Sequence, residues 1–202
     1  YQLNGILIPG ARPNVFYSRL VTAAAARQKA FGQSGPAHIA KAEAVYEPVR
    51  PFIQKFHSSE YINALANGDI CLAVGWSGDV LQARDRAAEA DAGVTVEYII
   101  PKEGALMWFD NMAIPSDAPH VEEAHEFLNY IMRPEVMAKA SNYVYYANGN
   151  AASKEFLNED VIGDTAIYPD EATLENLYTV TPFEGSEQRS LTRLWTKIKS
   201  GT

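Results

Sequence analysis

Two pairs of a tryptophan and an aspartate are the residues of this chain whose types and spacing could do chemistry. In the first pair, two residues separate Trp76 from Asp79, and in the second pair one residue separates Trp108 from Asp110. An ammonium group gains from a carboxylate and from an aromatic face, the latter contributing about 0.5 to 2 kcal/mol. Two such pairs are suited to holding an organic cation whose aliphatic part lies against the rings.

Each pair also has a structural interpretation, and spacing alone leaves both interpretations open. Asp79 could cap a helix that begins at the next residue, and both tryptophans could fill the core. Hydrolysis by Asp79 and Asp110 is the enzymatic alternative, because glycosidases use two acids that flank a bond. The sequence supplies no other part of a sugar site.

No cofactor, metal site or nucleophile is predicted. His120 and His125 lie five residues apart on a predicted helix, so they diverge around it instead of sharing a metal. The chain contains no phosphate-binding loop, dinucleotide motif or nucleophile elbow. Its single cysteine, Cys71, lies within a predicted strand and is interpreted as core filler.

Composition narrows the class of partner. The 202 residues are 47% hydrophobic, enough for one large or two small domains. The 25 acidic residues against 17 basic ones give a net charge of −8, which argues against nucleic acid or anionic membrane as a partner. No apolar run approaches the roughly 20 residues that span a bilayer, and the first residues lack a signal-peptide pattern. We therefore expect a cytosolic protein, or a processed or shortened chain.

The first pair follows directly after an apolar run over 70–74, which is bounded by glycines and typical of a strand buried on both faces. An amphipathic helix is predicted over 80–90. In an open α/β sheet, ligands bind outside the carboxyl ends of the strands. Trp76 and Asp79 therefore stand where a ligand is expected.

The second pair lies in an extended segment predicted over 105–114. Side chains two residues apart in an extended chain point the same way, so Trp108 and Asp110 should share one side. Met107 and Phe109 should then face the opposite side, toward the core. Together with the first pair, this predicts an α/β fold with two aromatic and acidic positions at its ligand-binding edge.

Apolar periodicity and breaker residues predict the other elements. His57 and the two serines after it offer an N-cap for a helix over 61–66. Strands are also expected over 5–8 and 94–100, and helices over 15–29, 37–55 with interruptions at Pro48 and Pro51, 121–131, 133–140 with Pro134 in its first turn, 153–158, 171–177 and 187–199.

Several motifs in this sequence resemble the periplasmic putrescine/spermidine-binding proteins of bacterial polyamine ABC importers. The motifs are FHSSEYINALANGDICLAVGWSGD at 56–79, IPKEGA at 100–105, WFD at 108–110, FLNYIMRPEV at 127–136, YAN at 146–148 and WTKIKSG at 195–201. The resemblance extends from about residue 36 to the end of the chain. It corresponds to the C-terminal part of such a protein, so most of the N-terminal lobe would be missing.

The resemblance implies a periplasmic-binding-protein type II-like fold, in which two α/β lobes close on a polyamine. Residues 1–94 and 139–202 would form the C-terminal lobe, and 95–138 the crossover portion of the other lobe. The implied ligand contacts are rings of Trp76 and Trp108 around the methylene chain, carboxylates of Asp79 and Asp110 on the amino groups, and Tyr146 completing the aromatic box. The implied partner is an ABC permease, the implied location is the periplasm, and no reaction is catalysed.

Residues 1 to about 35 match the family poorly, and Asn14 stands where the family has an acid that contacts the ligand. An amide cannot neutralise an ammonium group, so another cationic amino compound is an alternative ligand. A further alternative is a fragment that binds no ligand and associates with another copy through its exposed lobe interface. The sequence thus predicts polyamine binding with an incomplete site, and a possible homo-oligomer.

Overall fold

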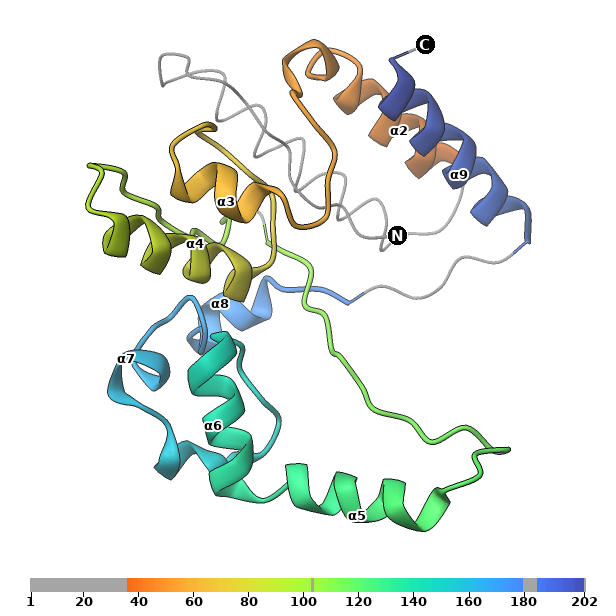
Figure 1. Cartoon of the computed structure of the whole chain (residues 1–202). Helices are drawn as coiled ribbons and strands as arrows, with labels where there is room; N and C mark the ends of the chain where they lie inside the picture. The colour runs from red at the N-terminus through yellow and green to blue at the C-terminus, as the bar shows by residue number, and fades with distance from the viewer. Residues whose placement is uncertain (1–35, 103, 180–184, 202) are drawn as a thin grey trace.

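The computed structural model describes residues 36–102, 104–179 and 185–201, where every regular element is a helix (Figure 1). The elements are α2 (Pro36–Tyr46), η1 (Arg50–Phe52), α3 (Tyr61–Ala66), α4 (Ser77–Ala90), α5 (Val121–Ile131), α6 (Pro134–Val144), η2 (Ala151–Phe156), α7 (Glu159–Ile162), α8 (Glu171–Glu175) and α9 (Gly185–Ser200). The strand predicted over 5–8, the helix predicted over 15–29 and Asn14 lie outside the described residues.

α2 and α9 lie side by side, although they come from distant parts of the sequence (Figure 1). Tyr46, Val49 and Ile53 are buried there against Leu194 and Ile198 of α9. Val49 and Ile53 are among the predicted apolar positions, but they flank η1 and lie after the end of α2, so the segment after α2 covers α9 together with the helix. This apolar cluster joins the end of the chain to its earliest described helix.

The segment after α2 holds the C-terminal end of α9. As predicted, the helix is interrupted near the two prolines, and α2 ends at Tyr46. Arg50, in η1, donates from Nε to the carbonyl oxygen of Ile198 at 2.5 Å and from Nη2 to that of Lys199 at 2.7 Å. The last carbonyl groups of a helix have no partner within it, so Arg50 caps α9.

α3 and α4 pack together around a second cluster and position the first Trp–Asp pair. The buried side chains of this second cluster are Tyr61, Leu65, Ala66, Ile70, Val80, Ala83, Ala87 and Val96. The apolar stripe predicted for 61–66 is therefore confirmed. The chain leaves α3 through Gly68, whose φ of 75° favours glycine.

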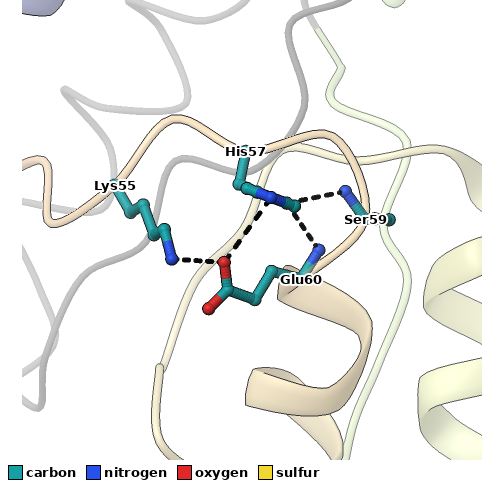
Figure 2. A network of polar contacts seen from close by, with 4 residues as sticks. All are labelled: Lys55, His57, Ser59 and Glu60. Atoms are coloured by element: carbon teal, nitrogen blue, oxygen red, sulfur yellow. Dashed lines mark hydrogen bonds and ion pairs between the residues drawn. The ribbon is translucent and has the colours of Figure 1, made fainter.

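His57, within the predicted N-cap segment, caps the turn that leads into α3, and Glu60 is the N-cap residue of the helix (Figure 2). Its Nδ1 accepts hydrogen bonds from the backbone N–H groups of Ser59 at 3.3 Å and Glu60 at 3.0 Å. The Glu60 carboxylate contacts Lys55 Nζ and lies 3.7 Å from His57 Nε2. Two otherwise unpaired N–H groups at the start of the helix thus find an acceptor in an imidazole ring.

A third cluster, made by Leu81, Val161 and Ile167, joins α4 to α7. Nearby, α6 packs against η2 around a buried polar network centred on Asn148. The Asn148 side chain donates to Ser141 Oγ at 2.9 Å and accepts from Ser153 Oγ at 2.9 Å. This network fixes the turn at 145–150.

The segments predicted as strands at 70–74, 94–100 and 105–114 form no regular strand in the part of the chain that the structure describes. Along 94–100 burial alternates, with Val96 7% exposed and Ile99 72% exposed, as on a strand with one covered face. In 105–114, Leu106 forms a single parallel bridge with Tyr178. An apolar run specifies an extended backbone, but a strand also needs hydrogen bonds from a neighbour that the run itself does not specify.

The prediction that 70–74 is buried on both faces is wrong. Ile70 is buried in the α3–α4 cluster, whereas 72–74 are half-buried and Cys71 is exposed. Cys71 is therefore not core filler. Phe109, expected on the core side, is exposed as well.

The helices at 121–131 and 134–144 match the prediction, with Pro134 at the start of α6. No residue from 105 to 137 is buried. None of the helices in the described ranges is both long and apolar enough to cross a membrane.

Candidate functional site

Asp79 lies in the first turn of α4, and Trp76 is the N-cap residue of that helix. The Trp76 backbone is extended, with φ −78° and ψ 144°, and its side chain is half-buried. The interpretation of Asp79 as the helix cap is therefore wrong. A carboxylate in the first turn still gains from the positive end of the helix dipole.

Two tyrosines donate hydrogen bonds to the two oxygens of the Asp79 carboxylate. Tyr61 Oη lies 2.5 Å from Oδ2, and Tyr146 Oη lies 3.2 Å from Oδ1. The Tyr61 hydroxyl also accepts a hydrogen bond from the Trp76 backbone N–H at 3.1 Å. The consecutive helices α3 and α4 and the distant 145–150 turn thus meet at this carboxylate.

Two glycines make room for the tyrosine rings. A Cβ at Gly75 would lie 2.4 Å from Tyr61 Cε2, and a Cβ at Gly78 would lie 2.4 Å from Tyr146 Cε2. The Gly78 position would also lie 2.5 Å from the Val144 carbonyl oxygen. The absence of side chains at these positions allows both rings to reach Asp79.

Burial, together with Asp79, keeps both phenols protonated. Burial and then the hydrogen bond to Asp79 raise the pKa of Tyr61. Burial and then the negative charge of Asp79 raise the pKa of Tyr146. Both hydroxyls are therefore donors, and the half-buried Asp79 side chain accepts a hydrogen bond from each.

Trp108 and Asp110 contact each other, as the spacing predicted. Trp108 Nε1 donates to Asp110 Oδ1 at 3.2 Å, and the Trp108 side chain is 55% exposed. The polar contacts of this second pair share no residue with those of the first pair. The structure thus brings Asp79 and Tyr146 together in the first turn of α4, where Trp76 is the N-cap residue, and it brings Trp108 and Asp110 together separately.

Sequence reasoning assigned Tyr61 to the apolar stripe of α3 and missed its contact with Asp79. The available signal was a tyrosine at a fully buried position, because a buried phenol hydroxyl usually requires a hydrogen-bond partner. Among the described residues, no group of three or more histidine, cysteine, aspartate or glutamate side chains could hold a metal ion. The cluster is therefore one of negative charge, aromatic faces and phenol donors.

Comparisons with known proteins identify the family of this chain. Residues 14–169 match the family model of bacterial extracellular solute-binding protein. The putrescine-binding periplasmic protein SpuD of Pseudomonas aeruginosa is 48% identical over 82% of this chain and 45% of its own length. The putrescine-binding periplasmic protein PotF of Escherichia coli is 50% identical over 76% of this chain and 41% of its own length. The chain thus spans less than half the length of these curated relatives.

Solved structures agree on the fold. A putative spermidine/putrescine ABC transporter from Listeria monocytogenes has a TM-score of 0.75 and 28% identity, covering 92% of this chain and 56% of that one. The substrate-binding protein PotD from Streptococcus pneumoniae has a TM-score of 0.73 at 21% identity, covering 98% of this chain and 66% of its own. The fold is that of the periplasmic substrate-binding proteins, and the chain belongs to the family of bacterial extracellular solute-binding proteins.

Proposed function

We propose that this chain contributes one side of a binding site for putrescine-like diamines, for delivery to an ABC permease from the periplasm, without a chemical reaction. The observation that carries the proposal is the Asp79 carboxylate, held by two protonated tyrosines next to Trp76. Each carboxylate oxygen can accept more than one hydrogen bond, so acceptor capacity remains for an ammonium group. The names of the two putrescine-binding relatives support the choice of ligand.

In this proposal the two Trp–Asp pairs act on opposite parts of one ligand. Asp79 and Asp110 accept hydrogen bonds from amino groups, while Trp76 and Trp108 lie against the methylene chain. Tyr146 contributes a further aromatic face and stays bonded to Asp79. A charged hydrogen bond is the stronger contribution, at about 1.5 to 3 kcal/mol net, and the rings select for an aliphatic spacer.

The two pairs belong to different lobes in this proposal. Residues 1–94 and 139–202 form the C-terminal lobe, and 95–138 form part of the other lobe. The exposure of 105–137 supports this division for that part of the segment, because exposed apolar surface marks an interaction site, whereas Val96 packs in the α3–α4 cluster. Closure of the lobes would then bring Trp108 and Asp110 toward Asp79.

Calorimetric titration of a version extended to the length of its relatives tests the function. We expect putrescine to bind, and butylamine, which carries one ammonium group, to bind at least about 30-fold more weakly, because one charged hydrogen-bonded contact is lost. Spermidine and lysine extend the series to other cationic amino compounds. Equal affinity for putrescine and butylamine would contradict a site with two carboxylates.

Asp79→Asn tests the residue that carries the proposal. We expect it to weaken putrescine binding by about 2 to 5 kcal/mol, the usual cost of removing one side of a buried charge pair. Asp69→Asn is the matched control, because Asp69 is an exposed aspartate in the turn after α3. If both variants bind putrescine as tightly as the unaltered protein, the site lies elsewhere.

A further inference from the structure

The Tyr61 hydroxyl is bonded to both residues of the first pair. It donates to Asp79 Oδ2 at 2.5 Å and accepts from the Trp76 backbone N–H at 3.1 Å. Tyr61 itself is 0% exposed, so a ligand in an open cleft cannot touch it. Any effect of Tyr61 on binding must therefore pass through the residues that its hydroxyl contacts.

We infer that Tyr61 is a positioning residue that fixes the Asp79 carboxylate and the start of α4 for an incoming ammonium group. The inference rests on the proposed function. An aspartate carboxylate turns broadly about its terminal torsion, so one donor leaves its plane variable. With Tyr61 on Oδ2 and Tyr146 on Oδ1, both oxygens are held and the plane is set before the ligand arrives.

The two tyrosines differ in what else they do. Tyr146 is half-buried and can itself lie against a ligand, so a change there alters several contacts together. Tyr61 is wholly enclosed in the α3–α4 cluster, and its ring lies against the Gly75 backbone. Its hydroxyl thus has a fixed position, and a rigid donor behind a charged group reduces the freedom that the group must lose on binding.

The hydrogen bond to the Trp76 backbone adds a second effect. Trp76 is the N-cap residue of α4, and Asp79 follows three residues later. One hydroxyl therefore sets both the entry of the chain into α4 and the orientation of the carboxylate in its first turn. As a result, Trp76 and the Asp79 carboxylate keep a constant position relative to each other.

Tyr61→Phe in the version extended to the length of its relatives is the direct test, because it removes the hydroxyl and keeps the buried ring. We expect putrescine affinity to fall by roughly tenfold, in line with loss of one charged hydrogen bond behind the binding group. Tyr46→Phe is the control, because Tyr46 is an equally buried tyrosine in the α2–α9 cluster. We expect that variant to bind putrescine as the unaltered protein does.

A double-mutant cycle separates positioning from a general effect on the fold. In an Asp79→Asn background, Tyr61→Phe should change putrescine affinity by less than about twofold, because the two residues act as one unit. Tyr61→p-aminophenylalanine keeps a neutral N–H donor in the same place. We expect it to restore affinity to within about threefold of the unaltered protein, which a role in packing alone would not produce.

The outcomes are distinguishable. If the unaltered protein binds no putrescine, the proposed function is overturned and this inference with it. If it binds putrescine and Tyr61→Phe binds equally well, only the positioning role is overturned. A tenfold loss that persists undiminished in the Asp79→Asn background would also overturn it, because Tyr61 would then act without Asp79.

Discussion

At the scale of single residues, the two aspartates are held in different ways. Asp79 is bonded through both oxygens to protonated tyrosines and is half-buried, so its orientation is set in advance. Asp110 is exposed and accepts a hydrogen bond from the indole of Trp108. A preset carboxylate loses less freedom on binding than a free one. We therefore expect Asp79 to define the ligand position and Asp110 to close on it.

Asp110→Asn should weaken putrescine binding by about 2 to 5 kcal/mol in the version extended to the length of its relatives, because an amide cannot pair with the second ammonium group. Folding should be unaffected, since Asp110 is exposed. Calorimetry measures the affinity. Asp117→Asn is the control, because Asp117 is an exposed aspartate in the same segment, and it should bind putrescine as the unaltered protein does. An unchanged affinity for Asp110→Asn would make Asp110 structural.

Gly78→Ala should destabilise the chain by about 1 to 3 kcal/mol, as overpacking does. The new Cβ would meet the Tyr146 ring at 2.4 Å and the Val144 carbonyl oxygen at 2.5 Å, and the carbonyl oxygen cannot rotate away. Urea unfolding measures the change. Gly149→Ala is the control, because nothing lies within 4 Å of its added Cβ. Equal stability of the two variants would show that Tyr146 does not lie against α4.

At the scale of elements, helices were predictable and strands were not. α5 and α6 follow from a 3.6-residue apolar period and a first-turn proline, which are local signals. Residues 70–74 and 94–100 were identified as extended, but burial of a strand depends on segments elsewhere in the chain. Tyr61 was missed for the same reason: its partner, Asp79, is 18 residues away and belongs to another helix.

Arg50→Ala should lower the free energy of unfolding by about 1.5 to 3 kcal/mol, because charged hydrogen bonds to the end of α9 are lost. The guanidinium also lies over the Phe56 ring, 5.4 Å from its centroid. Urea unfolding followed by circular dichroism measures the loss. Arg189→Ala is the control, because Arg189 is an exposed residue of α9. It should change the free energy of unfolding by less than about 0.5 kcal/mol. A similar small change for Arg50→Ala would mean that α9 needs no cap.

At the scale of the whole molecule, buried side chains and exposed apolar ones are unevenly distributed. The three apolar clusters draw on residues before 100 and after 144. Between 105 and 137 large apolar side chains remain exposed, namely Trp108, Phe109, Met112, Val121, Phe127, Tyr130 and Met132. Exposed apolar surface of this kind marks an interaction site. In the described part of the chain, the segment 105–114 pairs through the Leu106–Tyr178 bridge, and a strand edge of this kind can also pair with a second chain.

We therefore predict that a chain of residues 1–202 forms a homodimer or a larger species through 94–114 or α5, since exchange of identical elements is a low-cost way to cover such surface. Light scattering across a dilution series measures the mass. Phe127→Glu, in α5, should shift the species toward monomer, because a buried carboxylate without a partner is costly. Phe156→Glu changes an exposed phenylalanine in η2 and should leave the mass unchanged. A stable monomer at micromolar concentration would contradict the prediction, and 105–137 would then need no cover.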